Sequence, residues 1–219
     1  MTIEGFNLFR KDRKDRLGGG VVIYVRSGIE ATVEPVLTAK GFEDAIWCWV
    51  GRGAERMLMG VVYRSTASSE DNNGRLLEMM RAAVEAAGGN HLLLMGDFNY
   101  PQPGEEKAGE RVNTAAEQFR EATRDLYLVQ HIGDHTRVRQ SQRPSKLDLV
   151  FTLDENVVQD ICFQDPLGKS DHVTVVFRYK MAVQSVQSRQ PVKDFWKADY
   201  GAMQRELGGV DWEVKLEGM

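Results

Sequence analysis

Cysteine is scarce in this chain of 219 residues, which holds only Cys48 and Cys162. Two cysteines exclude the disulfide framework of a small secreted protein, and a structural zinc site would need more of them. Both lie in apolar, strand-like runs, so we predict two buried thiols in a reducing compartment.

Long apolar runs are also absent. No stretch approaches the roughly 18–20 apolar residues that span a bilayer. Residues 1–16 are largely charged and lack the apolar core of a secretory signal. We therefore expect an intracellular protein, nuclear or cytoplasmic, with no membrane segment.

Neither sign of charge dominates, because the net charge is −4. This balance argues against broad electrostatic adhesion to nucleic acid. Basic residues nevertheless cluster at 10–16 and 137–146, and each cluster is either a solvated loop or the basic rim of an acidic pocket. A basic rim would suit a phosphate-bearing substrate.

Apolar periodicity predicts an α/β protein. A dinucleotide fingerprint is missing, because the glycines at 18–20 precede a strand-like run rather than a helix. We expect polar loops at 101–109 and 131–146, one domain over residues 1–180, and a linker with a partial helical tail over 181–219. The expected strands are 4–10, 21–25, 31–37, 45–50, 57–63, 92–95, 126–129, 147–152, 157–163 and 173–177, and the expected helices are 69–87 and 114–124.

The stretch 91–100, HLLLMGDFNY, concentrates polar groups at the end of an apolar strand. Asp97 and Asn99 are two residues apart, so on extended backbone they point the same way, at the carboxyl end where α/β proteins tend to carry chemistry. The alternative is a local turn in which the same side chains bond to nearby backbone.

Asp148 lies inside the apolar run 147–152, where a carboxylate needs a partner. His172 is a natural partner, because a carboxylate behind an imidazole fixes its tautomer and stabilises its charged form. Asp171 is a hard oxygen ligand suited to Mg²⁺. No Ser or Cys nucleophile accompanies a base, so metal-assisted attack by water suits this set best. Alternatively, His172 is an ordinary satisfied histidine and Asp148 makes a strand-end hydrogen bond.

Three segments resemble the signatures of the endonuclease/exonuclease/phosphatase superfamily: GDFN at 96–99, SKLDLVF at 145–151 and SDHVTVVF at 170–177. The runs GGGVVIYV, VVYRS and DFWKAD are most similar to the endonuclease domain that precedes the reverse transcriptase in non-LTR retrotransposons. The resemblance implies a four-layer α/β sandwich, with two packed mixed β-sheets flanked by helices. It also implies cleavage of DNA phosphodiester bonds with Mg²⁺, or Mn²⁺, and a reverse transcriptase domain as partner.

The resemblance further implies roles for individual residues. Asp97 would activate the attacking water and help to bind the metal, and Asn99 would assist it or hold the phosphate. His172 would contact the scissile phosphate, Asp148 would polarise His172, and Asp171 would be a metal ligand. Tyr63 would form a hydrogen bond with the phosphate, and Arg64 beside it would contact the substrate. Thr136 and Ser145 would make further contacts with the phosphate or the backbone.

The chain departs from the family pattern at its beginning. Family members open with a strand bearing an Asn, and a later Glu is a principal metal ligand, whereas the match here starts after both. Glu4 does not match that segment. We therefore expect a sandwich that lacks its first strands. Two alternatives to an endonuclease stay open: an inactive retroelement remnant with at most a binding function, and a phosphatase acting on an inositol lipid or a small phosphoester.

Overall fold

The computed structural model describes residues 2–13, 19–39, 41–53, 55–100, 114–139, 143–181, 198–212 and 215. The chain divides into two compact units, residues 1–186 and 187–219. The predicted loop at 101–109 and most of the predicted linker lie outside the described residues. In the second unit, helix α4 (Tyr200–Gly208) begins after Asp199, whose Oδ1 accepts a hydrogen bond from the Ala202 N–H.

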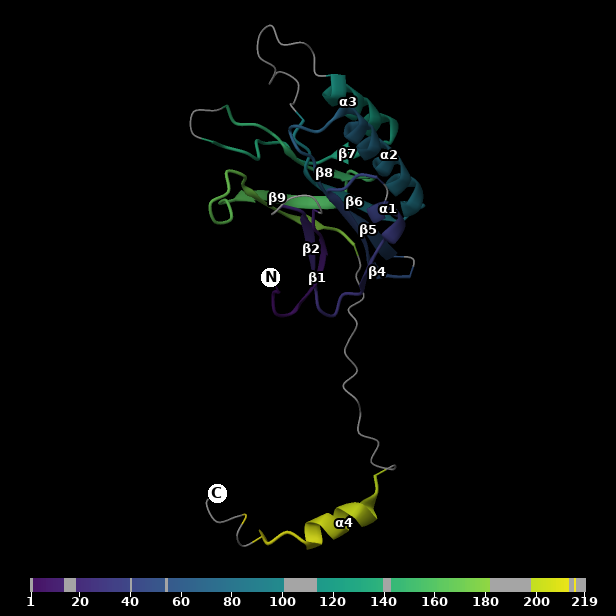
Figure 1. Cartoon of the computed structure of the whole chain (residues 1–219), viewed down its shortest axis with the longest axis vertical. Helices are drawn as coiled ribbons and strands as arrows, with labels where there is room; N and C mark the ends of the chain where they lie inside the picture. Colours follow the sequence, from purple (N-terminus) through teal and green to yellow (C-terminus); the bar gives the residue numbers. More distant parts are fainter. Residues whose placement is uncertain are drawn as a thin grey trace. The chain divides into compact units, whose positions relative to one another are not determined.

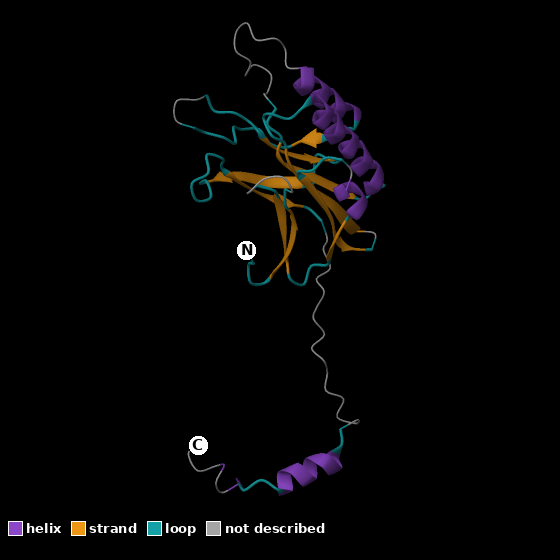
Figure 2. Ribbon diagram, viewed as in Figure 1, coloured by secondary structure: helices purple, strands orange, loops and turns teal. Residues whose placement is uncertain are grey.

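A six-stranded mixed sheet organises the first unit (Figures 1 and 2). Its strand order is β3-β4-β5-β6-β8-β7, and β5 and β6 are its one parallel pair, the other neighbours being antiparallel. The predicted hairpin of β4 and β5 is confirmed. The strands are β3 (Ala31–Val33), β4 (Ala45–Arg52), β5 (Glu55–Tyr63), β6 (His91–Asp97), β7 (Val129–Gln130) and β8 (Asp148–Thr152).

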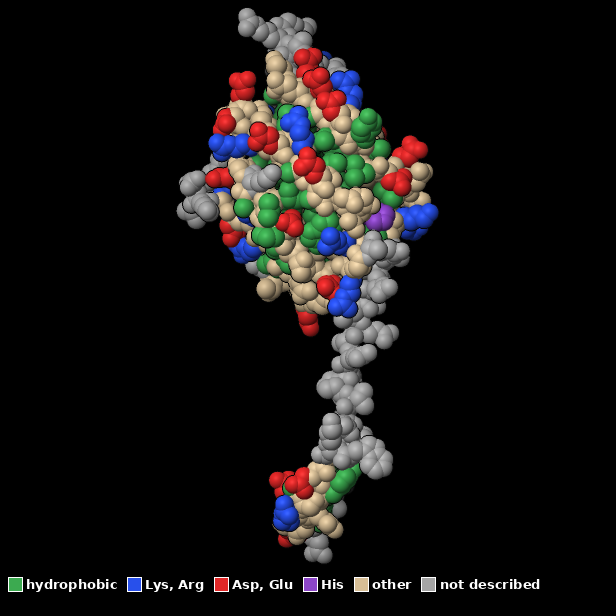
Figure 3. Space-filling model, turned by 90° about the vertical axis from the view of Figure 1, so that its right-hand side faces the viewer, with side chains coloured by type: hydrophobic (Ala, Val, Ile, Leu, Met, Phe, Trp, Pro, Cys, Tyr) green, Lys and Arg blue, Asp and Glu red, His purple; other side chains and the backbone are tan. Residues whose placement is uncertain are grey.

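Helices cover one face of this sheet (Figure 2). They are α1 (Pro35–Ala39), α2 (Glu70–Ala87) and α3 (Thr114–Asp125), and the apolar core beneath them includes Trp47, Leu76 and Phe119. As predicted, Ser69 caps α2 by accepting from the Asn72 N–H, and Gly88 ends it in the left-handed conformation. The solvent side of this layer carries acidic and basic side chains interspersed (Figure 3).

Two antiparallel ribbons pack against the opposite face of the sheet. One is β1 (Phe6–Lys11) with β2 (Val21–Arg26), and the other is β9 (Val158–Gln164) with β10 (Thr174–Tyr179). Alternation along β2 buries Val21, Ile23 and Val25 in a second core between the layers. The predicted mixed α/β sandwich is confirmed, and its second β-layer consists of these two ribbons.

Three local predictions were wrong. In the segment 126–129, which was expected to be a strand, only Val129 lies in a strand, β7. The segment 31–37 is a short strand followed by α1, because Pro35 has the fixed φ that suits a first helical position. Cys48 is buried as predicted, but Cys162 is exposed, since it points away from the side of β9 that packs on the sheet. None of the helices in the described part of the chain has the length and apolarity needed to cross a membrane.

Candidate active site

The ends of three neighbouring strands lie side by side at one end of the sheet. Tyr63 ends β5 and is paired in register with Asp97, which ends the parallel strand β6. Asp97 is in turn paired with Asp148, which begins the antiparallel strand β8. Two carboxylates and a phenol that are far apart in the sequence therefore lie side by side.

Gly96 allows β6 to end in this way. Its φ is +144°, and a Cβ at this position would lie 1.9 Å from the carbonyl oxygen of Val62 on β5. Such a distance is a severe clash, so β5 and β6 can approach here only if residue 96 has no side chain.

Asp97 and Asn99 form the local turn that was the alternative to a catalytic role. Asp97 Oδ1 accepts a hydrogen bond from the Asn99 N–H at 3.1 Å, and Asn99 is left-handed, with a φ of +50°. Asn99 Nδ2 donates to the carbonyl oxygen of Arg64 at 2.8 Å. The amide therefore holds the turn in shape, while Asp97 stays beside Asp148.

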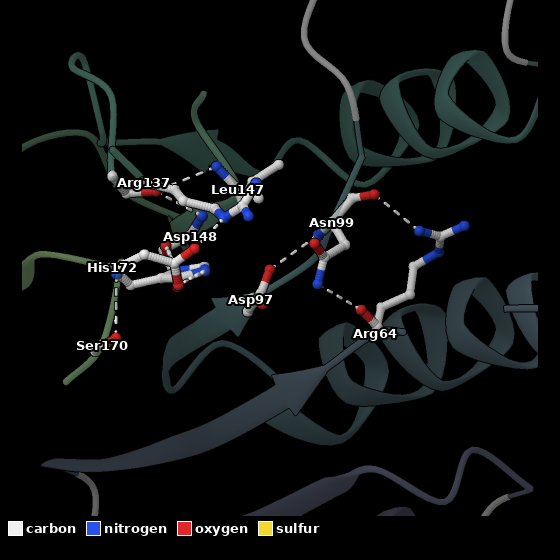
Figure 4. A network of polar contacts seen from close by, with 10 residues as sticks. Arg64, Asp97, Asn99, Arg137, Leu147, Asp148, Ser170 and His172 are labelled. Carbon is white, nitrogen blue, oxygen red and sulfur yellow. Dashed lines mark hydrogen bonds and ion pairs between the residues drawn. The ribbon is translucent and has the colours of Figure 1, made fainter. Parts of the chain in front are cut away.

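Arg64, for which a contact with substrate was predicted, is buried, with 5% of its surface exposed. Its Nε donates to Asn73 Oδ1 at 2.8 Å. Its Nη1 donates to the carbonyl oxygen of Asn99 at 2.9 Å (Figure 4). The guanidinium also lies 3.9 Å from the centre of the Tyr100 ring. Arg64 thus joins the Asp97–Asn99 turn to helix α2 and holds the turn in place.

His172 and Asp148 form a close pair (Figure 4). His172 Nδ1 donates to Asp148 Oδ2 at 2.7 Å, and the backbone N–H of His172 donates to Ser170 Oγ at 3.0 Å. Thr136, for which a contact with phosphate or backbone was predicted, is fully buried. Its hydroxyl accepts from the N–H groups of Leu147 and Asp148, which positions Asp148.

The pKa values of Asp97 and His172 are both raised. Burial, and then the charge of Asp148, raise the pKa of Asp97 from 3.8 to about 6. The hydrogen bond to Asp148 raises the pKa of His172 against the opposing effect of burial. Asp97 can therefore exchange a proton near neutral pH, and His172 keeps its positive charge to a higher pH than a free histidine.

Asp171 is engaged by a residue that sequence analysis did not single out. Arg137 Nε donates to Asp171 Oδ2 at 2.9 Å. Desolvation is the largest single influence on the pKa of Asp171 and raises it, but the hydrogen bond from Arg137, a backbone hydrogen bond and the charges of Arg137 and His172 together hold that pKa below its usual value. Ser145 exchanges two backbone hydrogen bonds with Arg137, both of 3.0 Å. The basic cluster at 137–146 was the signal in the sequence, but nothing local marked the contact with Asp171.

A divalent cation fits the donor set. Among the described residues, one ligand atom each from Asp97, Asp148 and His172 lies within 4.8 Å of the others. Mg²⁺ prefers one or two carboxylates and completes its shell with water, so Asp97 and Asp148 would hold it. Asp171, the other predicted ligand, is outside this group.

Tyr63 has a second neighbour that the sequence did not reveal. The Arg13 guanidinium lies 4.8 Å from the centre of the Tyr63 ring and forms two hydrogen bonds with the Asp44 carboxylate, of 2.7 and 3.0 Å. The backbone N–H of Tyr63 donates to the Asp44 carbonyl oxygen at 2.8 Å. These contacts hold the phenol beside Asp97.

Comparison with known proteins identifies the family of this chain. Residues 57–176, more than half of the chain, match the profile of the family described as Endonuclease-reverse transcriptase. No curated protein sequence matches the chain.

Solved structures share the fold at low sequence identity. The endonuclease domain of TRAS1, a telomere-specific non-LTR retrotransposon, has a TM-score of 0.63 at 15% identity, covering 82% of this chain and 80% of that one. The AP endonuclease LMAP from Leishmania major has a TM-score of 0.62 at 12% identity, covering 82% and 72%. The catalytic domain of Xenopus laevis APE2 has a TM-score of 0.54 at 13% identity, covering 84% and 79%.

Proposed function

This chain belongs to the endonuclease-reverse transcriptase family of the endonuclease/exonuclease/phosphatase superfamily, and on this premise we propose that it hydrolyses phosphodiester bonds in DNA. The observation that carries the proposal is the convergence of Asp97, Asp148 and His172 at one end of the sheet. Residues 1–180 would carry the activity and residues 181–219 would form a linker and partial helical tail. The name of the family points to a reverse transcriptase as the partner domain.

The residues divide the chemistry between them. Asp97, with a pKa raised to about 6, would accept a proton from the attacking water. His172 donates its Nδ1 proton to Asp148, which leaves Nε2 to donate to the phosphate and stabilise the developing negative charge. Tyr63 would hold a phosphate oxygen, and Asn99 would keep the turn that presents Asp97.

A divalent cation, Mg²⁺ or Mn²⁺, is the proposed cofactor. Bound to Asp97 and Asp148, it would offset the repulsion between two adjacent carboxylates and a phosphate, and stabilise charge in the transition state. The two carboxylates are the hard oxygen donors that such an ion takes.

The test is nicking of supercoiled plasmid with Mg²⁺ or with EDTA. We expect the wild-type chain to nick only with the metal, and His172→Ala to lose about 10²-fold or more in rate, the effect typical of a lost transition-state donor. His135 is exposed on the loop that precedes β8, and His135→Ala is the matched control with unchanged nicking. Unchanged nicking in His172→Ala would refute the assigned role.

Two further outcomes would each overturn the proposal. If the wild-type chain fails to nick under all metal conditions, the chain is an inactive remnant with at most a binding function. If it instead releases inorganic phosphate from a phosphomonoester and leaves plasmid intact, the chain is a phosphatase on the same scaffold.

A further inference from the structure

Arg137 is anchored beside the catalytic cluster by its backbone. It forms isolated β-bridges with Ser145 on one side and with His172 on the other. The next residue, Val138, donates its backbone N–H to the Asp171 carbonyl oxygen at 3.0 Å, and Thr136 accepts from the Val173 N–H at 2.8 Å. The loop before β8 and the segment before β10 are thus joined in a defined register.

The side chain of Arg137 is aimed by Asp171. Arg137 Nε donates to Asp171 Oδ2 at 2.9 Å, and the other oxygen, Asp171 Oδ1, lies 4.0 Å from His172 Nε2. The Arg137 and Asp171 side chains are 24% and 39% exposed, so a ligand can reach both. A guanidinium carries five N–H donors, and this contact with Asp171 uses the single one at Nε.

The negative charge around His172 favours an additional positively charged side chain at this site. Asp97, Asp148 and Asp171 place three carboxylates around His172, and a phosphodiester carries a further negative charge. A guanidinium matches phosphate oxygens with two parallel hydrogen bonds, a geometry that an ammonium or imidazolium lacks. Arg137 is held in position to supply it.

We propose that Arg137 binds the phosphate that His172 faces, and that Asp171 positions Arg137 rather than coordinating the metal. The proposal rests on the function proposed above, because it names a substrate contact of the same site. Asp171 is already engaged by a guanidinium and lies outside the group of closely spaced metal-ligand atoms. Asp171 therefore acts on the substrate through Arg137.

DNA binding in EDTA tests the role of Arg137 without metal or turnover. The affinity for a short duplex is measured by fluorescence anisotropy at several salt concentrations. Loss of one phosphate contact lowers the slope of log K against log[salt] by about one, and we expect this for Arg137→Gln, while Arg137→Lys keeps most of the slope. Arg81 is exposed on α2, and Arg81→Gln is the matched control with an unchanged slope. An unchanged slope in Arg137→Gln would overturn the proposal.

Metal binding tests the role of Asp171. Calorimetric titration with Mg²⁺ should show the same affinity, within about twofold, for Asp171→Asn and the wild-type chain, whereas loss of a group that supports a metal site typically costs about 10–100-fold. A loss of that size would overturn the proposal.

A double-mutant cycle on KM for nicking completes the test. We expect KM to rise about tenfold in Arg137→Gln, the equivalent of about 1.4 kcal/mol, and to rise less in Asp171→Asn. The double variant should match Arg137→Gln alone, because Asp171 acts through Arg137. Additive effects would refute this coupling. A wild-type chain that binds DNA in EDTA but does not nick would count against the proposed function and leave the binding result for Arg137 intact.

Discussion

Replacement of Arg64 by leucine should destabilise the protein through the turn that Asp97 and Asn99 form. Arg64 is 5% exposed, and its guanidinium donates to Asn73 Oδ1 at 2.8 Å and to the Asn99 carbonyl oxygen at 2.9 Å. No carboxylate forms an ion pair with it among the described residues. Neutral oxygen atoms of Asn73 and of the turn backbone therefore accept the hydrogen bonds that an acidic side chain accepts from most buried arginines.

The expected loss follows from those contacts. Each hydrogen bond to a charged donor contributes about 1.5–3 kcal/mol, and the stacking on Tyr100 adds about 1 kcal/mol. Release of a buried charge offsets part of the sum. We expect a net loss of about 3–4 kcal/mol for Arg64→Leu. Arg64→Lys keeps the charge but not the fork of donors, so about 2 kcal/mol should be lost.

Urea unfolding followed by tryptophan fluorescence measures both variants. Arg26→Leu, at the exposed end of β2, is the control and should change the free energy of unfolding by no more than about 0.5 kcal/mol. A loss below about 1 kcal/mol in Arg64→Leu, or an equal loss in the control, would refute the reasoning. If Arg64→Leu does not fold, the Arg64→Lys measurement still decides.

Two further variants probe the end of β6. Gly96→Ala should cost about 3 kcal/mol or more, because its methyl would meet the Val62 carbonyl oxygen at 1.9 Å. Gly74→Ala in α2 meets nothing within 4 Å, so it should instead stabilise by about 0.5–1 kcal/mol, and equal urea midpoints for the two would contradict the assignment. The pKa of Asp97 is raised from 3.8 to about 6, so ionisation of Asp97 opposes folding and stability falls as the pH rises through this range. Asp97→Asn should therefore stabilise the metal-free protein at pH 7 by about 1–2 kcal/mol, after allowance for solvent screening. Below pH 3.8 it should leave the stability unchanged. A variant that is less stable than wild type at pH 7 in EDTA would contradict the predicted direction of the change.

Features of the fold that depend on neighbouring residues were predictable from the sequence. The helical spacing of 69–87, with Ser69 before it and Gly88 after it, is a complete local signal, and the structure has this helix. The stretch ending in Asp97 and Asn99 was recognisable because an apolar strand stops at a glycine and two polar groups follow.

The burial of individual polar residues was not predictable in the same way. The family resemblance implied roles at the substrate for Arg64 and Thr136, but both side chains are buried. Each is bonded to the element that follows it in the chain, Arg64 to α2 through Asn73 and Thr136 to the start of β8. The contact between Arg137 and Asp171 joins residues 34 positions apart, which only the tertiary fold specifies.

The division of the site between the sheet and the second ribbon has a consequence during synthesis. All six strands of the sheet, with Asp97 and Asp148, have been translated by Thr152, whereas His172 arrives with the β9–β10 ribbon. Pairing of β6 with β8 closes a long loop, and such non-local pairing is slow. Asp97 and Asp148 are therefore synthesised before His172. A nascent chain on the ribosome carries the two carboxylates without the histidine that is proposed to act with them.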